Sequence, residues 1–259
     1  VPSRTRDESP RAVVNAAEFA ARAEQELEYY RLQHPEMKNR VQVRDDVAGL
    51  MVSRGGLLIG ASSKIPPSRV EALLAHEVGT HVLTYVNGRA QPFRQLHVGL
   101  PGYDELQEGL AVFAEYLVGG LSRPRLRLLA ARVLATHRMI EGAGFVEVFR
   151  ELDRAHDFAQ RTAFTVAMRV FRGGGFTKDV VYLRGLAEVL AYLGRGEPFE
   201  RLHLGKISHD HLEVIEELEW RKVLRQPQLL PQHVDRPDVV ERLDRSRRGL
   251  TVLDTLKGA

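Results

Sequence analysis

Two histidines and a glutamate lie close together in a stretch whose apolar pattern is helical. His76, Glu77 and His81 fall within the segment LLAHEVGTHVL, residues 73–83. Imidazole and carboxylate groups are ligands of catalytic zinc ions, and a glutamate beside such an ion can act as a general base. The familiar helical zinc motif places its histidines at i and i+4, on one helix face. Here the spacing is i and i+5, which a regular α-helix does not bring to one face.

The extra residue between the histidines predicts a widened turn. Five residues rotate an α-helix by roughly 500°, which leaves the two imidazoles about 140° apart around the axis. A single-turn π-bulge would bring them together, and such bulges are frequent at functional sites. Gly79 lies between the histidines, where the missing Cβ makes irregular backbone easier. The alternative is a regular helix in which Glu77 and His81 form an ordinary i, i+4 pair.

A further carboxylate follows about one helix later in the chain. The stretch YDELQE, residues 103–108, predicts a helix start with Asp104 as the N-cap and Gln107 in the capping-box position. Glu108 lies at the end of the first turn and would supply a third metal ligand. The alternative is a glutamate that only favours the helix dipole.

These motifs together resemble the QEGLA-motif family, which includes the microtubule-associated tyrosine carboxypeptidases. Residues 76–81 match the family's His-Glu-x-x-x-His motif, and residues 107–111 are the QEGLA signature itself. The pairing of a two-histidine helix with a glutamate on the next helix also resembles the gluzincin zinc peptidases. The resemblance covers about residues 41–224. The remaining family blocks follow in the family's order: Arg172-Gly173-Gly174, Phe176-Thr177-Lys178-Asp179, Tyr182-Leu183 and Gly205-Lys206.

The resemblance implies a zinc-dependent carboxypeptidase that removes a C-terminal tyrosine or phenylalanine from a peptide or protein. One Zn²⁺ per chain would be held by His76, His81 and Glu108, with water in the fourth position. Glu77 would take the proton of that water and pass it to the leaving amine.

A carboxypeptidase also needs a fixed cation for the terminal carboxylate of its substrate, and a donor near the developing oxyanion. The family blocks and the helix that follows them suggest Arg172, Lys178 and Arg184 as substrate-binding cations and Tyr182 as the catalytic donor. The alternative for each is a surface ion pair or, for the tyrosine, ordinary packing.

Other histidines are weaker candidates. His97, in a loop, is an alternative ligand. His209-Asp210-His211 resembles a ligand cluster, but positions two apart on a helix point about 200° apart and chelate poorly. Two other function classes stay open: a metal-bearing regulatory protein without turnover, and an endopeptidase or aminopeptidase. A zinc site that is only structural needs no base, so Glu77 favours an enzyme.

Composition sets outer limits on the protein's class. The 259 residues can bury a substantial core, and the absence of cysteine excludes disulfides and thiolate ligands. The net charge of +3 is spread along the chain, which suits an acidic peptide partner and argues against nucleic acid. No apolar run approaches about 20 residues, so no membrane span is expected. Without a signal-peptide pattern, a cytoplasmic protein is the default expectation, although a targeting segment ahead of Val1 stays open.

The predicted fold is α+β and mostly α-helical, a gluzincin-like metallopeptidase domain over residues 1–259. It divides into an N-terminal helix (1–35), a catalytic core (36–225) and a C-terminal segment (226–259). Leu50–Ser53 and Gly55–Ile59 predict a hairpin with a Gly-Gly turn. We expect this small antiparallel sheet beside the metal helix, where its edge could bind substrate backbone by strand addition.

Local signals predict where the helices begin and end. Ser9-Pro10 predicts the first helix start, Ser68 with Glu71 a capping box for the metal helix, and Asn87-Gly88 the end of that helix. The remaining predicted helices are Pro124–His137, Gly144–Phe158, Gln160–Phe171, one capped by Thr177 through Leu193, His209–Leu224 capped by Ser208, and Pro237–Arg248.

Overall fold

The first helix lies along one side of the molecule and begins later than its proline suggested. The structure, a computed structural model, describes residues 12–173 and 178–256. Helix α1 (Ala16–Gln33) begins after Asn15, whose side chain accepts from the Glu18 amide while Glu18 accepts from the Asn15 amide. This reciprocal cap fixes the helix start, so the prediction of a start at Pro10 was wrong.

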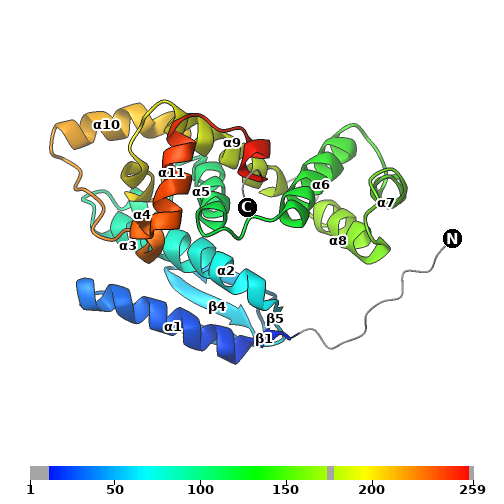
Figure 1. Ribbon diagram of the computed structural model, residues 1–259, viewed down its shortest axis with the longest axis horizontal. Helices are drawn as coiled ribbons and strands as arrows, with labels where there is room; N and C mark the ends of the chain where they lie inside the picture. The colour runs from blue at the N-terminus through cyan, green and yellow to red at the C-terminus, as the bar shows by residue number, and fades with distance from the viewer. Residues whose placement is uncertain (1–11, 174–177, 257–259) are drawn as a thin grey trace.

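Helix α1 covers a small mixed sheet (Figure 1). Strands β2 (Val41–Arg44), β4 (Gly56–Gly60) and β3 (Leu50–Ser53) lie in that order, with β3 antiparallel and β2 parallel to β4. The predicted hairpin is confirmed, but its two-residue turn is Arg54-Gly55, both with positive φ, and Gly56 belongs to β4. The expectation of an antiparallel sheet is therefore only partly right, because β2 pairs in parallel with β4 on the edge opposite β3. A two-residue ladder joins β1 (Val14–Asn15) to β5 (Lys64–Ile65).

The helix with the two histidines runs through four consecutive elements. They are the 3₁₀ turn η1 (Pro67–Arg69), α2 (Val70–His76), the π-helical η2 (Glu77–Val82) and α3 (Leu83–Arg89). No side chain caps the start of η1 or α2, so the predicted Ser68–Glu71 capping box was wrong. The end of α3 near Asn87-Gly88 is approximately as predicted, for a different reason: the Asn87 amide donates to the carbonyls of His203 and Leu229 and ties α3 to later segments.

A second core forms around α5 (Tyr103–Leu117) and α9 (Val181–Gly194), which pack side by side. Helix α5 begins after Gly102 in a left-handed conformation with no side-chain cap, so Asp104 is not its N-cap. The elements that complete this region are α4 (Gln95–Val98), η4 (Phe199–His203), η5 (His209–His211), α10 (Leu212–Trp220), η6 (Gln232–Asp235), α11 (Pro237–Arg247) and η7 (Val252–Leu256). Ser208 accepts from the Asp210 amide and caps η5, as predicted, but the helix that follows, α10, ends at Trp220 and is shorter than the predicted His209–Leu224.

Three helices form a lobe to one side of the two larger cores (Figure 1). They are α6 (Arg123–Ile140), α7 (Phe145–Arg154) and α8 (Gln160–Phe171), close to the three predicted helices, and they share an apolar cluster of their own. The 3₁₀ turn η3 (Lys178–Val180) leads from this lobe into α9; the predicted Thr177 cap lies outside the described residues.

The structure confirms a mostly helical α+β fold. The sheet lies against η2, beside the helix that carries the two histidines, as expected. The gluzincin-like assignment and the division into a single domain with three parts stay predictions. No described helix combines the length and the apolar character needed to cross a membrane.

Candidate metal centre

The predicted widened turn is confirmed at the histidine motif. Residues Glu77–Val82 form a π-helical turn between α2 and α3. The Thr80 hydroxyl donates to the Ala75 carbonyl, five residues earlier, at 3.1 Å. The surplus residue brings the two imidazole rings to the same side, with their centroids 5.0 Å apart and their planes at 80°.

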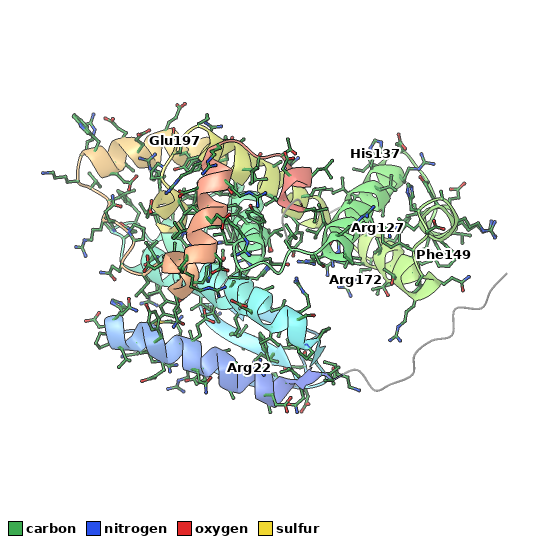
Figure 2. The ribbon with its side chains drawn as sticks, viewed as in Figure 1. Arg22, Arg127, His137, Phe149, Arg172 and Glu197 are labelled. Carbon is green, nitrogen blue, oxygen red and sulfur yellow. The ribbon has the colours of Figure 1, made fainter. Side chains whose placement is uncertain are left out.

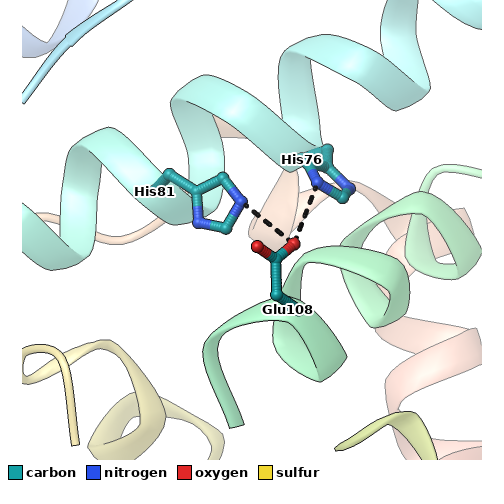
Figure 3. A group of neighbouring side chains, drawn as sticks. All are labelled: His76, His81 and Glu108. Carbon is teal, nitrogen blue, oxygen red and sulfur yellow. Dashed lines mark ion pairs between the residues drawn. The ribbon is translucent and has the colours of Figure 1, made fainter. Parts of the chain in front are cut away.

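Both imidazoles point at one carboxylate oxygen of α5 (Figure 3). His76 Nε2 lies 3.8 Å and His81 Nε2 lies 3.7 Å from Glu108 Oε2. Ligand atoms on a tetrahedral zinc ion are about 3.3 Å apart, given bond lengths near 2.05 Å. Two imidazole nitrogens and one carboxylate oxygen at this spacing therefore fit a zinc ion after small side-chain adjustments. In the described part of the chain, no other cluster of histidine and acidic side chains has this geometry, and neither His97 nor His209-Asp210-His211 belongs to the group.

The π turn is held in place from two sides. Thr84 donates to the side-chain carbonyl of Gln107 at 2.9 Å, which fastens the segment after the turn to the start of α5. On the other side, a Cβ on Gly79 would lie 3.3 Å from the His233 ring. Gly79 therefore also makes room for the C-terminal segment, a reason that its position in the motif did not reveal.

Glu108 is positioned by a close crossing of two helices. Gly109 and Gly185 face each other where α5 meets α9, and a Cβ on either would overlap backbone atoms of the other helix. The QEGLA stretch thus combines three tasks: Gln107 binds Thr84, Glu108 faces the histidines, and Gly109 lets α9 approach.

A buried carboxylate that the sequence analysis did not single out fixes the His76 ring. Glu115 Oε1 lies 3.0 Å from His76 Nδ1. Arg69 donates to Glu115 at 2.7 Å, and Arg125 donates to both carboxylate oxygens at 2.9 and 3.1 Å. When a carboxylate accepts a hydrogen bond from Nδ1–H, the lone pair of Nε2 stays available to a metal ion. This is the usual arrangement for metal-bound histidine. One feature of the sequence could have identified Glu115: it follows Glu108 by seven residues and therefore lies on the same helix face.

Charges around His76 favour its protonated form in the metal-free protein. Burial lowers the pKa of His76, but the hydrogen bond to Glu115 and the charges of Glu77, Glu115 and Glu108 outweigh burial, so the net shift is upward. Burial raises the pKa of Glu115, yet the His76 hydrogen bond and Arg125 hold it well below its usual range. The carboxylates of Glu77, Glu108 and Glu115 thus face the positive charges of Arg69, Arg125 and protonated His76, and a divalent cation would take the place of the His76 proton.

Glu77 directly follows the first histidine, at the start of the π turn. Its side chain is buried, and its charge acts on His76. A buried carboxylate that adjoins the first histidine in the chain is a candidate for a general base.

The other predicted site residues lie on α8, η3 and α9. Tyr182 is partly buried near Arg132, whose guanidinium carbon is 5.8 Å from its ring centre. Arg184 forms an ion pair with Glu105, and its side chain is 64% exposed. Arg172 is exposed at the end of α8, in the lobe (Figure 2). Lys178 opens η3, and its side chain lies outside the described residues. Binding roles for these four residues stay predictions.

Comparison with known proteins agrees with the resemblance read from the motifs. A family model described as Microtubule-associated tyrosine carboxypeptidase matches residues 1–250. Human microtubule-associated tyrosine carboxypeptidase 1 is 31% identical over 156 residues, 56% of this chain and 32% of that protein. Human MATCAP2, whose name also contains tyrosine carboxypeptidase, is 28% identical over 178 residues, 63% of this chain and 33% of that protein. The chain spans about a third of the length of these curated relatives.

Proposed function

Since the chain belongs to the microtubule-associated tyrosine carboxypeptidase family, we propose that it is a zinc-dependent carboxypeptidase that removes a C-terminal tyrosine or phenylalanine. The observation that carries this proposal is the convergence of His76, His81 and Glu108, with Glu77 buried beside them. Three nitrogen and oxygen ligands plus a neighbouring base form the donor set of a hydrolytic zinc centre.

Each residue of the group has a distinct task in this proposal. His76, His81 and Glu108 hold one Zn²⁺ per chain, and Glu115 keeps the His76 ring in the orientation that presents Nε2. When bound, Zn²⁺ would polarise the scissile carbonyl and make the attacking water more acidic. Glu77 accepts the proton from that water and then donates it to the leaving amine. Tyr182 serves as a donor to the developing oxyanion.

The substrate is the free C-terminus of a peptide or protein. Strand β3 is an edge of its sheet and packs against η2, so an extended substrate can pair with it next to the metal group. The names of the relatives support tyrosine as the terminal residue. The charge of this chain, +3, is compatible with an acidic peptide partner.

A peptide library with every C-terminal residue tests the proposal. We expect mass spectrometry to show loss of a single C-terminal tyrosine or phenylalanine, and no loss after treatment with a chelator. Internal cleavage would indicate an endopeptidase, and loss from the N-terminus an aminopeptidase. No cleavage of any peptide by zinc-loaded protein would contradict an enzymatic role and favour the regulatory alternative.

Glu77→Gln separates catalysis from metal binding. We expect turnover to fall by several orders of magnitude, because the amide cannot accept the proton, while elemental analysis still finds one zinc ion per chain. His76→Ala should instead lose the metal. Glu213→Gln makes the same charge change at an exposed position of α10 and should leave both measurements unchanged. Full activity in Glu77→Gln would refute the assignment of the base.

A further inference from the structure

Two arginines from the lobe converge on the carboxylate of Asp179, in the turn η3. Arg169, on α8, donates through Nε to Asp179 Oδ1 at 2.5 Å. Arg132, on α6, has its Nη1 3.7 Å from the same oxygen. One carboxylate oxygen thus faces two guanidinium groups. The cluster formed by Arg132 and Arg169 therefore carries more positive charge than Asp179 neutralises.

Arg132 has fewer hydrogen-bond partners than Arg169 among the described residues. Its side chain is only 14% exposed, yet within the described residues its guanidinium makes no hydrogen bond, and its Nε is fully buried without an acceptor. Burial lowers the pKa of Arg132, and the charge of Arg169 lowers it further. Buried guanidinium donors are almost always hydrogen-bonded, so this group is arranged to receive an acceptor that the described residues do not provide.

Two observations connect the cluster of Arg132 and Arg169 with the group formed by His76, His81 and Glu108. Burial lowers the pKa of Arg169, but Asp179, Tyr182 and Glu108 together raise it, so Arg169 is within electrostatic reach of the proposed ligand Glu108. Helix α6 provides a second connection. Its Arg125 binds Glu115, which orients His76, and Arg132 follows seven residues later on the same face.

We propose that Arg132 and Arg169 bind the terminal carboxylate of the substrate, with Asp179 holding Arg169 in place. This inference rests on the proposed carboxypeptidase function. It attributes the preference for a free C-terminus to these two arginines. Guanidinium groups match a carboxylate bidentately, and a partly desolvated pair discriminates strongly against a neutral C-terminus. Tyr182, whose ring lies against Arg132, borders the same space. A substrate peptide that continues beyond this terminal residue, or ends in an amide, would leave the two arginines without a carboxylate to accept their hydrogen bonds.

The test compares a peptide that ends in free tyrosine with the same peptide ending in tyrosinamide. We expect the wild-type protein to prefer the free acid. In Arg132→Gln and Arg169→Gln, kcat/KM for the free acid should fall by about 30-fold or more, mainly through KM, while the slow rate on the amide stays unchanged. Arg169→Lys should restore part of the preference because it keeps the charge but loses the bidentate fork. Arg161→Ala removes a positive charge at an exposed position two turns earlier on α8 and serves as the matched control.

A binding measurement keeps the inference separate from the proposed function. Calorimetry with the Glu77→Gln protein compares affinity for the two peptides without turnover, and thermal melting checks that each arginine variant is folded. Folded arginine variants that prefer the free acid as strongly as wild type does would overturn the inference while leaving the carboxypeptidase intact. If wild-type protein cleaves nothing, the proposed function fails, and an arginine-dependent preference for the free acid in calorimetry still supports a carboxylate site.

Discussion

Glu115 shows how one buried side chain can orient a proposed metal ligand without itself facing the proposed ion. Its carboxylate forms ion pairs with three basic side chains, those of Arg69, Arg125 and His76, and is completely buried. Without those partners a buried carboxylate would become protonated; with them it stays charged and orients His76. Residues 108 and 115 therefore act together, although only the first faces the proposed ion.

Glu115→Gln tests this role. We expect zinc affinity to fall by about 10- to 100-fold, because the amide no longer polarises and orients His76. Competition with a chromophoric chelator measures the change. The variant also leaves the partly buried Arg69 and Arg125 without their carboxylate, so the free energy of unfolding should fall by about 3 kcal/mol. Glu241→Gln, exposed on α11, is the charge-matched control. Wild-type zinc affinity in a folded Glu115→Gln protein would contradict the proposed support of His76.

At the scale of the elements, the site depends on one irregular turn and one close helix crossing. The π turn supplies the rotation that a spacing of five residues requires, and α5 brings Glu108 to it. The contact with α9 fixes the position of α5, because the two backbones meet at Gly109 and Gly185. A change at that crossing should therefore reach the metal group without altering a ligand.

Gly109→Ala is the direct test of the crossing. The added methyl group would overlap the Gly185 backbone, so α5 and α9 must separate at a cost of about 1–3 kcal/mol. We expect a lower melting temperature and weaker zinc binding together, since Glu108 moves with α5. Gly56→Ala, where the new Cβ has only ordinary contacts at 3.5 Å, should change neither quantity. Unchanged zinc binding in a destabilised Gly109→Ala protein would show that the ligand tolerates displacement of the helix.

At the scale of the whole molecule, buried groups outside the His76, His81 and Glu108 cluster contribute to how stability varies with pH. Burial lowers the pKa of His203 to about 3 and that of His233 to about 4. Both histidines fold as neutral groups, so their contribution is complete above pH 6.5 and is lost as pH falls towards those values. Burial also raises the pKa of Glu26 and Glu188 to about 7. These carboxyl groups act in the opposite direction, because their contribution is present at low pH and lost as pH rises through 7.

Urea unfolding of metal-free protein between pH 7 and pH 5 separates the two effects. We expect a nearly flat profile for the wild type. His203→Gln should gain stability on acidification relative to wild type, on the order of 2 kcal/mol at pH 5, because it no longer excludes a proton. Glu26→Gln should change in the opposite direction, losing relative stability as pH falls. Parallel profiles for all three proteins would mean that neither group changes its protonation on unfolding.

The sequence alone determined the parts that depend on local spacing. The five-residue interval between His76 and His81 required an extra residue in the turn, because 3.6 residues per turn cannot otherwise face both rings one way. The QEGLA stretch and the family blocks indicated the family, and the apolar periodicity gave the three helices of the lobe within a few residues. Helix starts were less predictable: Pro10, Ser68 and Asp104 each carry a plausible signal, but Asn15, a 3₁₀ turn and Gly102 are used instead.

Only the tertiary structure decided what surrounds those motifs. Arg132 and Arg169 have no local signature, because an ordinary helix with exposed charges has the same sequence pattern, and the seven-residue spacing of Glu115 from Glu108 indicates only a shared helix face. Their surroundings depend on contacts between separate elements: Arg125 of α6 reaches Glu115 of α5, and Arg132 of α6 and Arg169 of α8 reach Asp179 of η3. Desolvation and ion pairing arise from those contacts and not from spacing along the chain. The sequence therefore set which side chains could face a metal ion, and packing set which charges support it.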